Sequence, residues 1–130
     1  MRDASPVVIP FLRRVLLLQG GFYVATGVWP LLHMPSFEWI TGPKVDDWLV
    51  YTVGLLLTVI GIALAVSGWR RRAGPALWIV AIGTPLAIAG IELVHVAIGR
   101  ISRVYLLDAV IELAFALALA MALVAQKRTA

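Results

Sequence analysis

Long apolar stretches alternate with short polar segments along the chain, and this pattern predicts four membrane-spanning helices. A helix that crosses the hydrocarbon core of a bilayer needs about 20 predominantly apolar residues. Four stretches meet this requirement: Val15–Leu32, Trp48–Trp69, Ala76–Ile98 and Val104–Ala125. We therefore expect an all-α, polytopic membrane protein in which residues 1–130 form a single membrane domain. Its expected architecture is an antiparallel four-helix transmembrane bundle.

The segments between these stretches predict how the helices are connected. Arg70–Pro75 and Gly99–Arg103 are short enough to be tight turns, which place consecutive helices beside each other in opposite directions. Residues 33–47 form a longer outer loop of mixed composition. The first span is longer than the apolar core of a signal peptide, and no convincing cleavage site follows it, so we expect it to be retained.

Residues typical of helix N-caps stand at two places in this outer loop. We expect Ser36, which follows Pro35, to cap a short helical turn at the membrane surface. Asp46 or Asp47 is expected to cap the second span, where a carboxylate also interacts favourably with the helix dipole. The outer loop is therefore expected to be partly helical.

The basic residues are distributed unevenly between the two ends of the spans and predict an orientation. One side carries Arg2, Arg13, Arg14, Arg70, Arg71, Arg72, Lys127 and Arg128. The other side carries Lys44, Arg100 and Arg103. Cytoplasmic segments of membrane proteins carry an excess of lysine and arginine. We therefore expect a multi-pass protein of the cell's inner (plasma) membrane with both termini in the cytoplasm.

Composition agrees with a membrane protein and excludes other classes. Hydrophobic residues make up 62% of the chain and charged residues 14%, against about half and a quarter in soluble domains. The chain contains no cysteine, which excludes disulfides and thiolate metal sites. The isoelectric point is near 10.1, but the basic residues flank the apolar spans. The expected partner is therefore the lipid bilayer, and no nucleic acid is expected.

Small residues form a stripe along the second span. They are Gly54, Thr58, Gly61, Ala65 and Gly68, spaced alternately four and three residues apart. Small residues let membrane helices approach closely, so the stripe predicts a helix–helix interface. That interface joins either two helices of one chain or two copies of the chain, as a homodimer through Gly54, Gly61 and Gly68. A less regular stripe, Gly83, Ala87 and Gly90, follows the third span.

Four ionisable residues lie inside the third and fourth spans at matching depths. With a rise of about 1.5 Å per residue, Glu92 lies about 10 Å and Glu112 about 13 Å from the outer ends of their helices. His95 and Asp108 lie about one turn closer to the surface. Charged groups at such depth are costly unless they are paired or neutralised. We therefore expect some of them to be protonated or paired, with Arg100 and Arg103 as candidate partners.

Helical periodicity places these polar residues on faces that can meet. Glu92 and His95 share a face of the third span, and Tyr105, Asp108 and Glu112 share a face of the fourth. The first span adds a polar stripe of Gln19, Tyr23, Thr26, Pro30 and His33. The stripe and the two faces predict one polar cluster in the outer half of the bundle. Such a cluster either hydrogen-bonds the helices together or forms a functional site.

Binding of a small or amphipathic molecule, such as a lipid, is the function that this pattern favours, because apolar walls with a few convergent polar groups are typical of ligand sites. The residues expected to line or floor the site are Glu92, His95, Asp108, Glu112, Tyr105, His33, Arg100, Arg103, Tyr23 and Gln19. Trp29, Phe37 and Trp39 are expected to form a lid or a stacking surface. No cofactor is predicted.

Three other functions remain open on the sequence alone. A non-catalytic accessory subunit would use the cluster to dock a partner. A membrane-embedded acid–base enzyme, such as an isomerase, would use Glu92 or Glu112 as the catalytic group, but the chain contains no recognised catalytic motif. The third alternative is proton or ion conduction, which would need an oligomer of the chain.

Metal binding is a fourth alternative with little support. Glu92 and His95 form one Glu-x-x-His pair, the unit that di-iron bundles use twice, and the fourth span has no second histidine. A mononuclear site would draw on His33, His95 and Glu92. We therefore predict no metal site.

The plan of the chain resembles the DoxX-like group of small bacterial four-helix membrane proteins. The similar features are Arg13 and Arg14 before a glycine-bearing first span, the loop and second span "TGPKVDDWLVYTVGLLLTVIGIALA", and acidic residues in the last helices. The resemblance implies a fold more than an activity, although some members look like membrane partners of redox enzymes. Glu92, His95, Asp108 and Glu112 match no motif of that group, so no functional residue is transferred.

Overall fold

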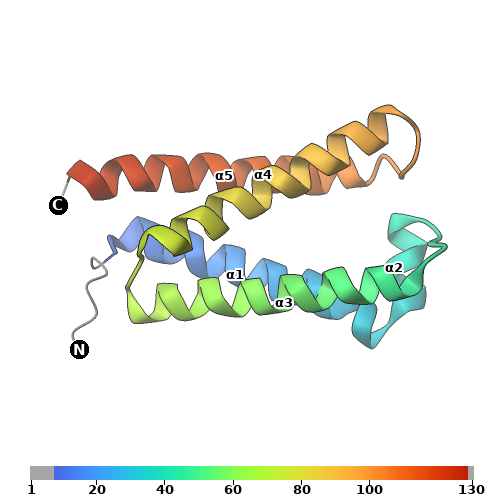
Figure 1. Ribbon diagram of the computed structural model, residues 1–130, viewed down its shortest axis with the longest axis horizontal. Helices are drawn as coiled ribbons and strands as arrows, with labels where there is room; N and C mark the ends of the chain where they lie inside the picture. The colour runs from blue at the N-terminus through green and yellow to red at the C-terminus, as the bar shows by residue number, and fades with distance from the viewer. Residues whose placement is uncertain (1–7, 129–130) are drawn as a thin grey trace.

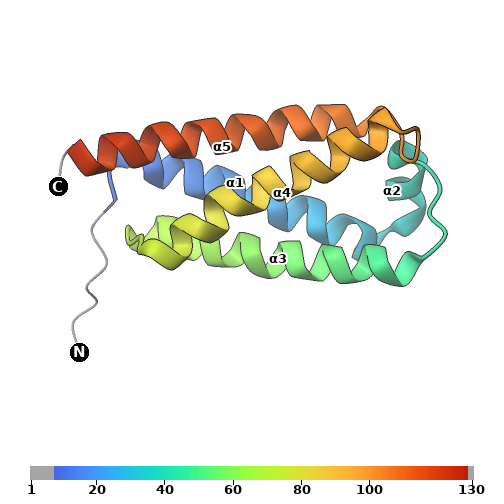
Figure 2. The same ribbon diagram turned by 45° about the horizontal axis from the view of Figure 1, so that its top comes forward.

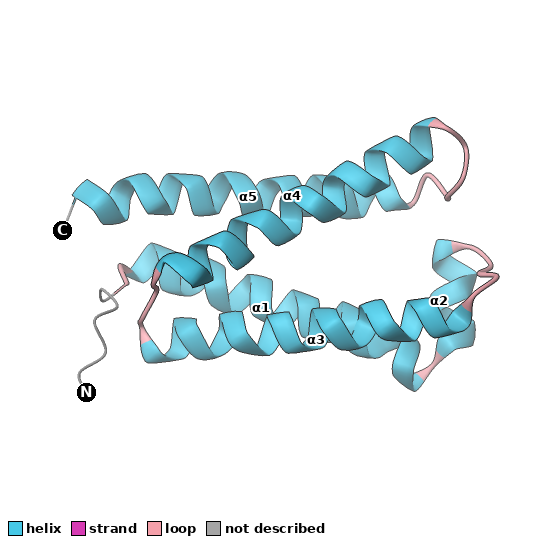
Figure 3. Cartoon of the chain, viewed as in Figure 1, coloured by secondary structure: helices cyan, strands magenta, loops and turns pink. Residues whose placement is uncertain are grey.

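The computed structural model describes residues 8–128, which consist of helices and short connections with no strand (Figure 3). The five helices are α1 (Pro10–Leu32), α2 (Met34–Thr41), α3 (Asp47–Arg70), α4 (Pro75–Ala97) and α5 (Tyr105–Arg128). The prediction that Arg2 lies on the basic side falls outside the described residues. The all-α expectation is confirmed for the part of the chain that the structure describes.

Each of the four predicted spans corresponds to one long helix. α1, α3, α4 and α5 have 23, 24, 23 and 24 residues, and each is apolar enough to cross a membrane. α1 begins at Pro10, five residues before the predicted start of its span. Proline suits the first turn of a helix because its missing N–H has no intrahelical partner there.

The predicted helical turn in the outer loop is a full helix, α2, but Ser36 does not cap it. The cap is His33, whose side-chain Nδ1 accepts a hydrogen bond from the Ser36 N–H at 3.1 Å. α2 ends at Thr41, and the residue after it is Gly42, whose φ of +97° favours glycine. Asp46 is the N-cap residue of α3, but its side chain makes no capping hydrogen bond. The prediction of Ser36 as a cap is therefore wrong, whereas Asp46 occupies the predicted cap position without a capping side-chain bond.

α1 packs against α3 through glycines on both helices. A Cβ atom added to Gly61 would lie 2.6 Å from the carbonyl oxygen of Gly20, and one added to Gly54 would lie 2.5 Å from that of Gly27. Gly68 completes the series against Arg13, so rising residue numbers on α1 meet falling numbers on α3. The small-residue stripe thus faces a helix of the same chain, and a second copy would have to use another surface.

α4 packs mainly against α5 through small residues that flank two glutamates. The buried residues of α4 include Ala81, Ala89 and Glu92. The buried residues of α5 include Ala109 and Glu112. Alanines allow the two backbones to approach, and the contact places both carboxyl groups inside the molecule.

The two helix pairs lie lengthwise beside each other, with both ends of the described chain at one end of the molecule (Figure 1). α4 starts close to the α1–α3 pair and crosses obliquely, so that it ends beside the start of α5, in the half that also holds α2 (Figure 2). The pairs therefore contact each other closely near the chain ends and separate toward α2.

Large apolar side chains cover the outside of the long helices, as expected for surfaces in contact with lipid. On α4, Ile79 and Leu86 are exposed, whereas Ile82 packs against the core. The predicted packing of the stripe through Gly83 and Gly90 is wrong within the chain, because nothing lies within 4 Å of a Cβ added to either glycine. The buried face of α4 is the neighbouring face, which carries Pro85 and Glu92.

Candidate functional site

A pocket of about 490 Å³ lies between the two helix pairs, and every helix contributes to its lining. α3 supplies an apolar wall that includes Leu49, Val50, Val53 and Leu57. Aromatic side chains come from α1, α2 and α5, namely Phe22, Trp29, Phe37 and Tyr105. The acidic lining consists of Glu92, Asp108 and Glu112. An apolar chamber with a few polar groups at one place is the usual form of a small-molecule site.

The carboxyl groups of Glu92 and Glu112 form the buried floor of this pocket. The exposed fraction is 6% for Glu92 and 1% for Glu112. Asp108 interacts with Glu92 from the facing helix and is half-buried. The Oε2 atom of Glu92 is buried and has no hydrogen-bond partner. Since a buried polar atom normally has a partner, this oxygen is the feature that calls for an explanation.

A hydrogen-bonded chain of side chains from α1 supports the floor. The Tyr23 hydroxyl donates to Oε2 of Glu112 at 2.5 Å, and Gln19 Nε2 approaches the Tyr23 hydroxyl at 3.5 Å. Gln19 and Tyr23 are both fully buried. Because this chain fixes Glu112 from below, its other carboxyl oxygen is directed away from Tyr23.

The chain ends at a backbone carbonyl of α4 that a proline has left free. Gln19 Nε2 donates to the carbonyl oxygen of Ala81 at 2.9 Å. In a regular helix that oxygen would accept from the N–H four residues later, but Pro85 stands there and has no N–H. Gln19 therefore replaces the missing bond, and α1 is joined to both α4 and α5.

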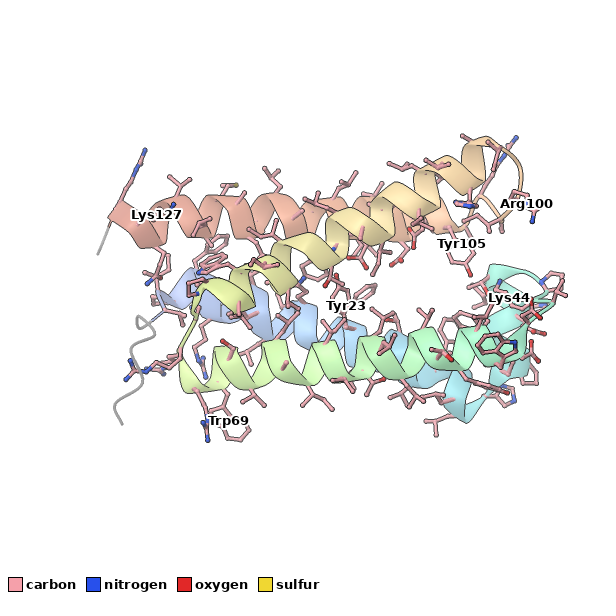
Figure 4. The ribbon with its side chains drawn as sticks, in the orientation of Figure 1. Tyr23, Lys44, Trp69, Arg100, Tyr105 and Lys127 are labelled. Atoms are coloured by element: carbon pink, nitrogen blue, oxygen red, sulfur yellow. The ribbon has the colours of Figure 1, made fainter. Side chains whose placement is uncertain are left out.

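Lys44 closes the end of the pocket near α2. Its Nζ lies 5.3 Å from the centroid of the Tyr105 ring and 5.7 Å from that of Phe37. Figure 4 shows Lys44 and Tyr105 facing each other where the helix pairs are apart, with Tyr23 at the deeper end. The ammonium group also donates to Thr41 and to the Gly42 carbonyl. These contacts bridge the outer loop and α5.

The structure brings six of the ten predicted site residues together. Glu92, Tyr105, Asp108 and Glu112 line the pocket, and Gln19 and Tyr23 lie beneath it.

The other four predicted residues lie elsewhere. His33 caps α2, and Nδ1 of His95 bonds to the Ile91 carbonyl of its own helix at 2.7 Å. Arg100 and Arg103 are exposed in the α4–α5 connection, and Figure 4 shows Arg100 pointing away from the pocket. The expected pairing of these arginines with the buried carboxyls is absent from the described residues.

No group of three histidine, aspartate or glutamate side chains within residues 8–128 is arranged to hold a metal ion. The three residues considered for a mononuclear site, His33, His95 and Glu92, are accordingly not gathered at one point.

The sequence missed the residues that form the wall and the end of the pocket. Trp29 and Phe37 do line it, and their rings pack edge-to-face at 5.3 Å, but Trp39 is 85% exposed and takes no part. From the sequence alone, Lys44 is only one of the basic residues on the outer side. Its position depends on the turn at Gly42, which no periodicity in the sequence indicates.

The pocket therefore combines hydrogen-bond acceptors at one place with apolar and aromatic walls. Comparison of the chain with family models, with curated proteins and with solved structures finds no match.

Proposed function

We propose that the chain is a multi-pass protein of the inner (plasma) membrane whose four long helices form an antiparallel bundle. Both ends of the chain are in the cytoplasm, and α2 lies on the outer side. The uneven distribution of arginine and lysine between the two ends of the helices supports this orientation. We also propose a kinship of architecture with the DoxX-like group, supported by the loop and second span quoted above.

Cysteine labelling tests the orientation, because the natural chain contains no cysteine. Ser102 and Arg70 are exposed at opposite ends of the long helices. We expect Ser102→Cys to react with a membrane-impermeant maleimide in cells whose outer barrier has been removed. Arg70→Cys is expected to react only after lysis. The reverse pattern would place the chain ends outside.

We propose that the pocket binds a small or amphipathic molecule in the outer half of the bundle. The observation that carries this proposal is the unpartnered, buried Oε2 of Glu92 at the floor of an otherwise apolar chamber. Leaving a buried acceptor without a partner costs about 1–3 kcal/mol. Glu92 interacts with Asp108 of the facing helix, but this interaction leaves its buried Oε2 without a donor. A ligand donor in the pocket supplies what Glu92 lacks.

Native mass spectrometry of mildly extracted protein tests the binding proposal. We expect wild type to carry a reproducible adduct, and Glu92→Gln to lose at least about nine-tenths of it while remaining folded. Leu57→Trp, which fills the pocket from α3, is expected to remove it independently of the carboxyl. Glu38→Gln is the matched control, because Glu38 lies on α2 and does not line the pocket.

Two results would contradict ligand binding. A bare wild-type chain would favour the accessory subunit, in which the same surface docks a partner. An adduct that survives both Glu92→Gln and Leu57→Trp would place the bound molecule outside the pocket.

A further inference from the structure

The protein provides no cation for the acidic floor of the pocket. Lys44 is the one basic residue among the pocket-lining residues, and it is engaged at the far end. Its ammonium group donates to the Thr41 carbonyl, the Thr41 hydroxyl and the Gly42 carbonyl at 2.8–3.2 Å. Within residues 8–128, Glu92, Asp108 and Glu112 thus have no arginine, lysine or histidine as an ion-pair partner.

The floor of the pocket also has more hydrogen-bond acceptors than donors. Tyr23 occupies one oxygen of Glu112, and Oε2 of Glu92 is free. Glu92 and Asp108 interact carboxyl to carboxyl, which takes one proton between them, so the three groups of the floor keep more acceptors than donors and attract positive charge. A ligand that offers N–H donors, or a positive charge without donors, complements this floor. A phosphate or carboxylate group would be repelled by it.

The walls between the floor and the end of the pocket favour the same kind of ligand. Four aromatic side chains, Phe22, Trp29, Phe37 and Tyr105, line this part. Aromatic ring faces attract ammonium groups, most strongly where water is excluded. Lys44 already occupies this type of contact with Phe37 and Tyr105 at the end of the pocket. The interior rings remain available to a ligand.

On the side of the bundle, the pocket is lined by apolar residues that are exposed to the surrounding lipid. Val53 on α3 and Leu107 on α5 both line the pocket, yet 55% and 67% of their side-chain surfaces are exposed. These two residues therefore border an opening on the side of the bundle, where the surrounding solvent is hydrocarbon. Lys44 and Tyr105 lie against each other at the α2 end of the pocket. A ligand that partitions into the bilayer is suited to enter sideways.

We propose that the ligand is a lipophilic organic cation, a protonated amine or a quaternary ammonium group attached to an apolar body. The cationic group lies against Glu92, Asp108 and Glu112, and the body lies along the α3 wall. This assignment rests on the proposed binding function and specifies the chemical class of its ligand. A protonated amine donates a hydrogen bond to the free oxygen of Glu92, and pairing of either cation with a carboxylate lowers the cost of an isolated charge in the bilayer.

Two probes of similar length, each with a hydrogen-bond donor, test the charge preference: dodecylammonium and 1-dodecanol. Binding to protein in dodecyl maltoside is measured by titration calorimetry, with empty micelles as the reference. We expect the cation to bind wild type at least about tenfold more tightly than the alcohol, which corresponds to 1.4 kcal/mol. Glu92→Gln combined with Asp108→Asn is expected to abolish this preference, and Glu38→Gln to leave it unchanged.

The outcomes separate this inference from the proposed function. Equal binding of both probes, lost together in Leu57→Trp, would overturn the cation assignment while the pocket remained a binding site. A preference that survives even when Glu112→Gln is added to Glu92→Gln and Asp108→Asn would also overturn it, because the charge would then be recognised elsewhere. Absence of cation binding to wild type overturns the assignment too, and the native adduct decides the binding function separately.

Discussion

Gly61→Ile is expected to separate α1 from α3 and to lower the free energy of unfolding by about 3 kcal/mol, the upper end for overpacked cores. The added Cβ atom would meet the Gly20 carbonyl oxygen at 2.6 Å and the Val24 backbone nitrogen at 2.9 Å. Both atoms belong to the backbone of α1, so no side-chain rotation relieves the clash. Thermal unfolding of detergent-solubilised protein, followed by circular dichroism, measures the effect.

Gly83→Ile is the matched control for this experiment. Gly83 lies in the interior of α4, and nothing lies within 4 Å of an added Cβ atom. We expect its unfolding temperature to stay close to that of wild type, since a helix interior also favours isoleucine slightly over glycine. Equal destabilisation by the two substitutions would contradict the α1–α3 contact.

The same pair of variants distinguishes a contact within the chain from one between copies. Gly61 is buried against α1 of its own chain. The loss of stability in Gly61→Ile is therefore expected to be independent of protein concentration. A loss that grows on dilution would instead support a homodimer through Gly54, Gly61 and Gly68.

The four long helices were predictable because the spanning requirement acts on each segment separately. Length and apolar character of a single stretch decide whether it can cross a bilayer, and no knowledge of its neighbours is needed. The partner of the Gly54–Gly68 stripe was not predictable in this way. Gly20 and Gly27 match it seven residues apart, but a stripe on one helix does not indicate which helix it meets.

The floor of the pocket was predictable from helix geometry, whereas its rim was not. Glu92 and Glu112 lie well inside regular helices joined by a tight turn, so depth and face follow from residue number. His33 and Arg103 lie at helix ends and in connections, where the last turn and the loop set the direction of the side chain. Sequence periodicity contains no information about those angles.

The hydrogen-bond chain explains why a glutamine and a proline occur deep in the bundle at matching heights. Pro85 leaves the Ala81 carbonyl without its helical partner, and Gln19 supplies one from α1. The same glutamine also approaches the hydroxyl of Tyr23, which donates to Glu112. The carbonyl that the proline leaves free thus accepts a hydrogen bond from α1, and the same chain of side chains continues to the floor of the pocket.

Gln19→Leu is expected to lower the free energy of unfolding by about 1–3 kcal/mol, because the Ala81 carbonyl would be left buried without a partner. Pro85→Ala restores a backbone N–H that reaches this carbonyl within α4. In a Pro85→Ala background, Gln19→Leu should therefore cost less. A double-mutant cycle on unfolding free energies is expected to give a coupling of about 1 kcal/mol.

Pro75→Ala is the control for this cycle, since Pro75 begins α4 and its missing N–H leaves no interior carbonyl free. Gln19→Leu combined with Pro75→Ala should be additive. Additivity of Gln19→Leu with Pro85→Ala as well would mean that Gln19 does not compensate for the proline. The support of the pocket floor would then have to come from the bond between Tyr23 and Glu112 alone. Coupling specific to Pro85 would instead establish that Gln19 of α1 compensates for the proline in α4.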